Sequence, residues 1–189
     1  MNSTPARHDE AGLSFEDAAL GRGLPAEVEA VIQHAGRLPH APDEAEALLR
    51  QARAMAPTHP APLIALYRFH FYGHRLREAL AVAQEALAVA RTALGPGFGS
   101  SPPTAEQARF DAAVRFYLFT LKGHAYLSLR LGDVAAGKQA LEELRRLDPQ
   151  DCVGGAVLEQ VLARQGLDED DDIFATPQRP RGWAQKAPA

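Results

Sequence analysis

The segments DEAEALLRQARAMAP (residues 43–57) and REALAVAQEALAVAR (residues 77–91) decide the fold, because they repeat one pattern 34 residues apart. Ala45 and Ala52 of the first segment correspond to Ala79 and Ala86 of the second. Both segments space small and aliphatic residues at i, i+3, i+4 and i+7, which is typical of one face of a helix. A period of this length predicts stacked helical hairpins, and stacked hairpins commonly bind other proteins.

The composition favours a single all-α domain. The chain has 189 residues, enough for one domain with a substantial core. It is 46% hydrophobic but only 7% aromatic, and much of the apolar content is alanine, which suits closely packed helices better than a sheet. A net charge of -4 gives no global attraction to nucleic acid or to anionic lipid, so we expect neither nucleic acid nor a membrane as a partner.

Cysteine usage and the N-terminus bear on the compartment. Cys152 is the single cysteine, so the chain forms no internal disulfide and no multi-cysteine metal site. Residues 1–12 contain no apolar run that resembles a signal peptide. The chain has no uninterrupted apolar stretch of about 18 residues, the length that crosses a membrane. These observations predict a cytoplasmic protein.

Read in order, the chain predicts three antiparallel hairpins and a C-terminal capping helix. Asp43 and Thr104 are the expected N-caps of their helices, and a single helix of more than 25 residues is expected from Thr104 to Leu131. The segment GPGFGSSPP (residues 95–103) predicts a mobile loop between the second and third hairpins. The predicted helices cover residues 25–38, 43–55, 62–73, 76–94, 104–131, 134–149 and 157–164.

The ends of the chain read as tails around this domain. Residues 1–12 predict a disordered tail, residues 13–166 the helical domain, and residues 167–189 an acidic and then proline-rich disordered tail. SFEDAAL (residues 14–20) predicts a short additional helical turn. The run DEDDD (residues 168–172) is either a solvated tail or an internal competitor for a cationic groove.

LREALAVAQEAL (residues 76–87) and the segment from LGD to ALEELRRLDP (residues 131–149) resemble the tetratricopeptide repeat (TPR) family. The resemblance covers residues 25–166. It implies helix-turn-helix units with a small residue opening the second helix and a proline closing it. The chain departs from that pattern at Tyr67, where the family keeps a small residue, at Arg91, which replaces the closing proline, and at Gly137, which replaces an alanine.

A second resemblance rests on ALYRF (residues 65–69) and AYLSLRLGD (residues 125–133). These segments are similar to ones in small TPR proteins encoded beside bacterial nitrogen-fixation genes. This likeness implies a link to nitrogen fixation. It implies no mechanism.

In a TPR array, the first helix of each hairpin lines a concave groove, and the resemblance therefore implies a set of groove residues. The set combines cations with aromatic rings, which suits an acidic or extended peptide segment of another protein. The alternative is that the rings pack in the core and the cations solvate its edge. The main candidates are Arg68, Phe71, Tyr72, Phe119, Lys122, Tyr126 and Arg130, with His34, Arg37 and Ile64 as further ones.

Other chemistry has weaker signals. His70 and His74 are four residues apart, but Gly73 lies between them at an expected helix end, so we interpret them as a core and a turn residue and predict no metal site. Cys152 has no neighbouring histidine or second cysteine that would make it a nucleophile. The chain has no GxSxG motif and no P-loop. We therefore predict neither catalysis nor a cofactor.

The sequence thus predicts a non-catalytic adaptor or assembly factor that holds a segment or helix of a partner protein. An accessory subunit that oligomerises or covers a larger enzyme is the alternative in another class. The two differ in where apolar surface lies, which is a groove for the adaptor and an outer helix face for the subunit. A small metal- or redox-dependent enzyme is a third and less favoured class, which rests only on residues such as His70, His74 and Cys152.

Overall fold

The computed structural model describes residues 23–165, and the regular secondary structure in this range consists of helices joined by loops. The all-α prediction is confirmed for that part of the chain, while the predicted tails, the SFEDAAL turn and the DEDDD run lie outside it. The helices are α2 (Ala26–Gly36), α3 (Pro42–Met55), α4 (Pro60–Tyr72), α5 (Leu76–Leu94), α6 (Ala105–Phe110), α7 (Ala112–Arg130), α8 (Val134–Leu147) and α9 (Ala156–Gln165).

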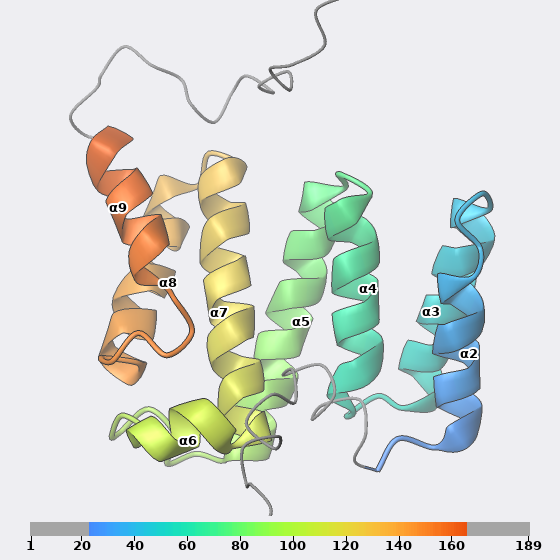
Figure 1. Ribbon diagram of the computed structural model, residues 1–189, viewed down its shortest axis with the longest axis horizontal. Helices are drawn as coiled ribbons and strands as arrows, with labels where there is room; N and C mark the ends of the chain where they lie inside the picture. Colours follow the sequence, from blue (N-terminus) through green and yellow to red (C-terminus); the bar gives the residue numbers. More distant parts are fainter. Residues whose placement is uncertain (1–22, 166–189) are drawn as a thin grey trace, which may run out of the picture.

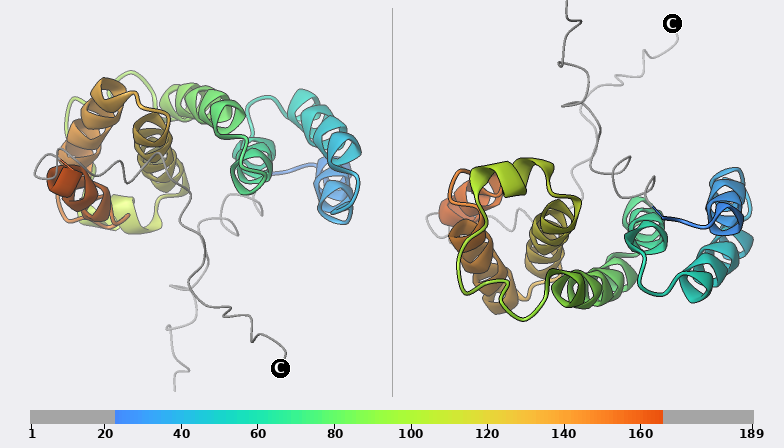
Figure 2. Two further views of the ribbon diagram at one scale, coloured as in Figure 1. Left: turned by 90° about the horizontal axis from the view of Figure 1, so that it is seen from above. Right: turned by 90° about the horizontal axis from the view of Figure 1, so that it is seen from below.

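The helices pack in consecutive pairs that stand in a row (Figure 1). α2 packs on α3, α4 on α5 and α7 on α8, and α5 also packs on α7 and α3 on α4. Views along the helices show two layers, with α2, α4 and α7 in one and α3, α5 and α8 in the other (Figure 2). α9 lies against α8 at one end of the row. No helix among residues 23–165 is both long and apolar enough to cross a membrane.

The prediction of one long helix from Thr104 to Leu131 is wrong, because the helix is interrupted at Asp111. The predicted capping box at Thr104 is present, with reciprocal hydrogen bonds to Gln107, but it opens only the short α6. Asp111 has ψ 117° and its carboxylate accepts hydrogen bonds from the backbone N–H of Ala113 and of Val114, at 2.9 Å each. That carboxylate caps α7, so a new helix starts in a new direction.

The predicted cap at Asp43 is also wrong. Ala41 is the N-cap of α3 and Pro42 is its first residue, where a proline loses no hydrogen bond. Asp43 lies in the first turn of the helix. A carboxylate there interacts favourably with the helix dipole without capping it.

The loop after α5 is anchored to the third hairpin. α5 ends at Leu94, and Gly95 turns the chain with φ 80°. The ring of Phe98 packs edge-on against that of Tyr117, with centroids 5.0 Å apart. Arg146 Nη1 donates a hydrogen bond to the carbonyl oxygen of Gly99 at 2.6 Å. The glycine- and proline-rich segment is therefore a loop, as predicted, but one with two attachments to α7 and α8.

Arg91, which stands at the closing proline of the repeat pattern, lies inside α5. Its guanidinium donates to the hydroxyl of Tyr117 at 2.7 Å and to the carboxylate of Glu143 at 3.2 Å. The Tyr117 hydroxyl in turn donates to Glu143, and the ring of Tyr117 is fully buried. Burial is the largest cause that raises the pKa of Tyr117, to about 12. Where a proline would end the helix, Arg91 extends α5 and joins it to α7 and α8.

Gly137 on α8 makes room for a leucine of α7. A methyl group at Gly137 would lie 2.5 Å from the Cδ2 atom of Leu129, closer than real side chains come. Both residues are buried, so the absence of a side chain on α8 lets α7 approach closely.

A groove between α4 and α7

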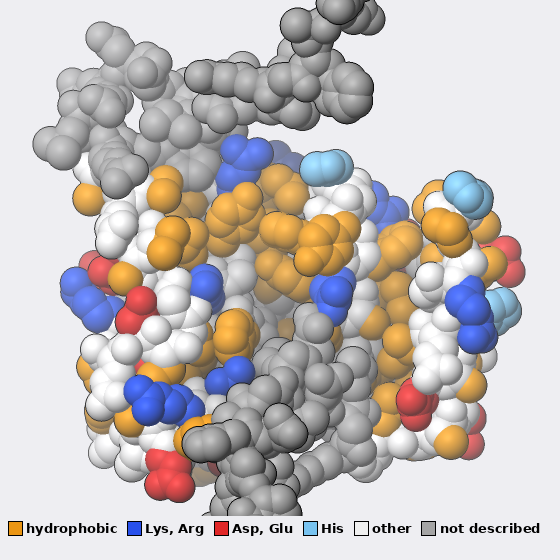
Figure 3. Space-filling model, viewed as in Figure 1, with side chains coloured by type: hydrophobic (Ala, Val, Ile, Leu, Met, Phe, Trp, Pro, Cys, Tyr) orange, Lys and Arg blue, Asp and Glu red, His pale blue; other side chains and the backbone are white. Residues whose placement is uncertain are grey.

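The helices α4 and α7 carry positive charge and no acid. Their sequences contain neither aspartate nor glutamate, although the chain as a whole has net charge -4. Their cations are Arg68 on α4 and Arg115, Lys122 and Arg130 on α7. On the face shown in Figure 3, hydrophobic side chains gather over these two helices among a few cations, and acidic side chains lie towards the edges. This part of the molecule is thus apolar and cationic.

Local sequence fixes the length and rotation of α4. The His59 side chain caps its start by accepting a hydrogen bond from the N–H of Ala61 at 3.1 Å, and Gly73 ends it. Leu63 and Leu66 lie on the buried face, packed into the main core. The opposite face, with Arg68 and Tyr72, is therefore left towards solvent, and Tyr72 is 69% exposed.

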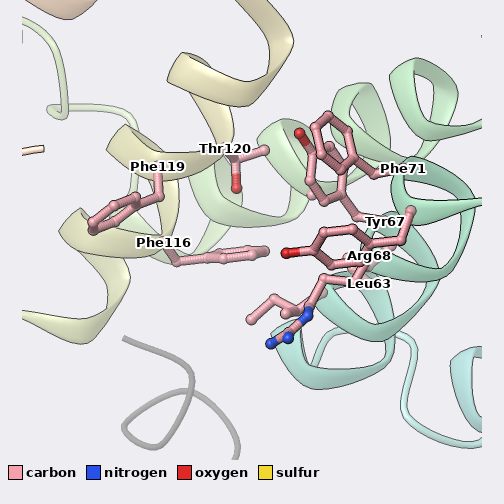
Figure 4. Close-up of a pocket in the computed structure, with 10 residues that line it drawn as sticks. Leu63, Tyr67, Arg68, Phe71, Phe116, Phe119 and Thr120 are labelled. Carbon is pink, nitrogen blue, oxygen red and sulfur yellow. The ribbon is translucent and has the colours of Figure 1, made fainter. Parts of the chain in front are cut away.

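A pocket of about 230 Å³ lies between the two helices, and we name it the α4/α7 pocket (Figure 4). Side chains from α4 form one wall and side chains from α7 the other, with Ala86 of α5 at its base. Arg68 is its only charged lining residue within the described chain. The lining residues are Leu63, Ile64, Tyr67, Arg68, Phe71, Tyr72, Ala86, Phe116, Phe119 and Thr120.

The side chain of Tyr67 on α4 packs directly against Gly123 on α7. A methyl group at Gly123 would lie 2.7 Å from the Tyr67 hydroxyl oxygen, so the tyrosine fits only because this position of α7 has no side chain. The Tyr67 ring stacks on that of Phe71, with centroids 5.7 Å apart. Burial is the main cause that raises the pKa of Tyr67, to about 12. The bulky Tyr67 side chain is therefore matched by a glycine on the neighbouring hairpin.

The structure brings some of the predicted groove residues together and separates others. Arg68, Phe71, Tyr72 and Phe119, together with Ile64, line the α4/α7 pocket.

The remaining candidates lie outside the pocket. The ring of Tyr126 contacts that of Phe71, with centroids 5.8 Å apart. Lys122 Nζ donates to the carbonyl oxygen of Val153 at 2.7 Å, which ties α7 to the loop before α9. Arg130 is the last residue of α7, and His34 and Arg37 are exposed at the end of α2.

Five lining residues were absent from the predicted set, namely Leu63, Tyr67, Ala86, Phe116 and Thr120. Phe116, Phe119, Thr120 and Gly123 stand at i, i+3, i+4 and i+7. This is a second helical face beside the core stripe of α7, so the spacing could have indicated Phe116 and Thr120. Tyr67 was visible as a departure from the repeat, but only the tertiary structure shows that it faces Gly123.

A second and larger pocket, of about 690 Å³, lies on the other side of α4, and we name it the α2/α4 pocket. It is formed by α2, the start of α3 and α4, and it shares Ile64, Arg68 and Tyr72 with the α4/α7 pocket. Gly36 borders it, and a Cβ atom added there would meet no atom within 4 Å.

The histidines lie where the sequence suggested. His70 is 2% exposed, and its Nδ1 lies 2.6 Å from Arg75 Nη2, while Arg75 also contacts Glu46 at 2.6 Å. Burial first, and then the charge of Arg75, lower the pKa of His70. His74 is exposed in the turn after α4, with φ 57°.

Metal-ligand geometry is not seen in the described part of the chain. Residues 23–165 contain no cluster of three or more histidine, cysteine or acidic side chains that could hold a metal ion. Cys152 lies in the α8–α9 loop, where its backbone N–H donates to Asp148.

Comparison with known proteins gives one informative relative. No protein-family model and no solved structure matches the chain. The chain is 37% identical over 140 residues to a protein of Azotobacter chroococcum mcd 1, named "Uncharacterized 19.8 kDa protein in nifW 5'region", covering 68% of this chain and 75% of that protein. The chain belongs to the same family as that protein. The name of this relative agrees with the resemblance of ALYRF and AYLSLRLGD to proteins encoded beside nitrogen-fixation genes.

Proposed function

We propose that this protein is a non-catalytic, TPR-like adaptor or assembly factor that holds a segment of a partner protein against α4 and α7. The observation that carries this proposal is the α4/α7 pocket, an apolar and aromatic pocket on two helices without acidic residues. Aromatic rings beside an arginine are the side chains that most often anchor a protein interface. An acidic or extended segment with apolar side chains complements this surface in charge and in polarity.

We further propose that the role is connected with nitrogen fixation. The support is the family relative, whose printed name refers to the nifW 5' region. That name specifies no partner, so the connection extends to the process alone.

The position of apolar surface favours an adaptor over a subunit that covers a larger enzyme. Among residues 23–165, the exposed large hydrophobic side chains outside the groove are Met55, Phe110, Val134 and Val157, which lie on four different helices. Single exposed hydrophobic residues are normal on a protein surface and do not indicate an interface. The pockets beside α4, by contrast, collect apolar side chains from several helices in one place.

Affinity capture with matched variants tests the proposal. Tagged full-length protein is incubated with extract of the native host grown with and without fixed nitrogen, and captured proteins are identified by mass spectrometry. The double variant Arg68→Glu, Thr120→Trp reverses the charge at Arg68, which lines the α4/α7 pocket, and fills that pocket, so it should lose the specific partner. Arg77→Glu, at an exposed position on α5, is the control and should retain it. Lys122 is left unchanged, because it holds the α8–α9 loop.

Equal capture by wild type and by the folded double variant would argue against the groove. Circular dichroism and a melting curve establish that the variant is folded. Turnover of a substrate by the purified protein would argue against a non-catalytic role.

A further inference from the structure

The exposed edge of α4 forms a ridge between two pockets. Ile64, Arg68 and Tyr72 stand at i, i+4 and i+8 on one face of this helix. All three line both the α4/α7 pocket and the α2/α4 pocket. The two pockets are therefore neighbours on a single surface.

This surface is apolar in the pockets on both sides of α4 and cationic between them, at Arg68. The Arg68 guanidinium lies 5.9 Å from the centre of the Tyr72 ring, and both side chains are exposed. Asp43 is the only acid among the described residues that line the two pockets. A ligand carboxylate that approaches the exposed edge of α4 therefore meets Arg68, while apolar side chains of the ligand on either side of it can each enter a pocket.

Simple geometry fixes the spacing that a ligand needs. An α-helix with its side chains is about 10–12 Å wide, so a ligand crossing α4 must reach roughly that far between the pockets. In an extended chain, residues i and i+4 are about 13 Å apart, and i, i+2 and i+4 point to the same side. A helical segment spans only about 6 Å between i and i+4.

We propose that the partner crosses α4 as an extended segment in which two bulky apolar residues at i and i+4 flank an aspartate or glutamate at i+2. The acidic residue pairs with Arg68, one apolar side chain enters the α4/α7 pocket and the other enters the α2/α4 pocket. This inference rests on the proposed function and specifies the class of partner segment.

A random 12-residue peptide display library, selected on the immobilised full-length protein, tests this specificity. The expected result is enrichment of sequences with an acid between two bulky apolar residues at the stated spacing. The dissociation constant of the best selected peptide is then measured by fluorescence anisotropy on the protein and its variants. Gly36→Phe fills the α2/α4 pocket and Thr120→Trp fills the α4/α7 pocket, and each should weaken binding at least tenfold.

A matched control is available for the pocket-filling change. At Gly97, as at Gly36, a Cβ atom would meet no other atom within 4 Å and the backbone has no positive φ, but Gly97 borders neither pocket. Gly97→Phe should therefore leave the dissociation constant unchanged. Melting temperatures of all variants are measured alongside.

The outcomes separate this inference from the proposed function. If Thr120→Trp weakens binding while Gly36→Phe does not, the two-pocket inference is overturned and a groove on α7 survives. If neither weakens binding, or if no peptide is enriched, both fail. Selected peptides without an acid, or with apolar residues at i and i+7, also overturn the inference.

Two other occupants would be recognised in the same experiment. Light scattering that reports a dimer, dissociated by Gly36→Phe or Thr120→Trp, would overturn the inference in favour of a second copy of this chain. Peptides selected only after the acidic residues 168–172 are replaced by their amides would overturn it in favour of that run of this chain.

Discussion

The α4–α5 hairpin contacts the hairpin before it and the hairpin after it, and these two contact regions, which we call seams, are packed in different ways. In the first seam, between α3 and α4, a pocket of about 690 Å³ remains open beside a polar contact of Arg75 with Glu46 and His70. In the second seam, between the α4–α5 hairpin and α7, Tyr67 sits directly over Gly123.

A second contact joins α5 to α7 in this seam, where the Arg91 guanidinium donates to the hydroxyl of the buried Tyr117. The pocket that remains open there, the α4/α7 pocket, is the smaller of the two, at about 230 Å³. Arg91 stands where the second repeated segment departs from the first, which has Pro57, and Tyr67 lies outside both segments. Both residues contribute to this seam. The difference teaches that residues outside the shared pattern decide how neighbouring hairpins join.

The largest expected effect on stability comes from placing a proline at Arg91, the position in the second repeated segment that corresponds to Pro57 in the first. Arg91→Pro introduces proline three residues before the end of α5, where it removes a backbone hydrogen bond and clashes with the preceding turn. We expect a loss of about 3 kcal/mol or more in the free energy of unfolding, measured by urea denaturation. Arg91→Ala keeps the helix and loses only the contacts with Tyr117 and Glu143, so it should cost less, about 1–3 kcal/mol. Equal stability of Arg91→Pro and wild type would show that this seam does not depend on the last turn of α5.

Replacing Gly123 in the second seam by a larger residue should have the next largest effect on stability. Gly123→Leu places a side chain where the Tyr67 hydroxyl lies, and overpacking of this kind costs about 1–3 kcal/mol. The double variant Tyr67→Ala, Gly123→Leu should be more stable than the sum of the two single changes predicts, because the leucine then occupies the vacated space. Additive free energies of unfolding would mean that the two residues do not meet.

Mild acid should weaken the first seam through His70. Because burial and Arg75 hold its pKa below the usual 6.5, the folded protein favours the neutral ring, and the unfolded chain binds more protons as the pH falls. This contribution to stability is complete above about pH 6.5 and is lost as the pH falls from there towards the folded pKa. Urea denaturation between pH 7.5 and pH 5 should show a smaller loss of stability for His70→Gln than for wild type.

His124→Gln is the matched control, because burial also lowers the pKa of His124, which lies on α7. Comparing the two variants assigns the acid sensitivity to one seam or the other. An unchanged pH dependence in His70→Gln would exclude the first seam as the source.

The smallest effect is expected at the open glycine of the first seam. Gly36→Ala meets no atom within 4 Å and requires no positive φ, so it should be neutral or should stabilise the protein by up to about 1 kcal/mol. A melting curve is sufficient to measure it. A clear loss of stability would mean that the first seam is closed as tightly as the second.

The sequence predicted the helices well where local signals were strong. The expected range of α5, residues 76–94, agrees with the structure, and α8 begins at Val134 as expected. The sequence-based prediction failed at Asp111, because a single aspartate among apolar residues also occurs on the solvated face of a continuous helix. Only the hydrogen bonds that its carboxylate accepts from two backbone N–H groups identify it as a cap. The groove was predicted in part, since Arg68, Phe71, Tyr72 and Phe119 share the α4/α7 pocket while Lys122 is held by Val153.

By itself, the sequence determined the all-α class, most helix positions and the absence of acid from α4 and α7, because helix periodicity and charge are properties of neighbouring residues along the chain. Only the tertiary structure decided what the unusual residues contact. Tyr67 and Gly123 are 56 positions apart, and Arg91 and Glu143 are 52 apart, so no local pattern links them. Their pairing, and with it how much of each seam remains open, depends on the packing of whole helices against one another.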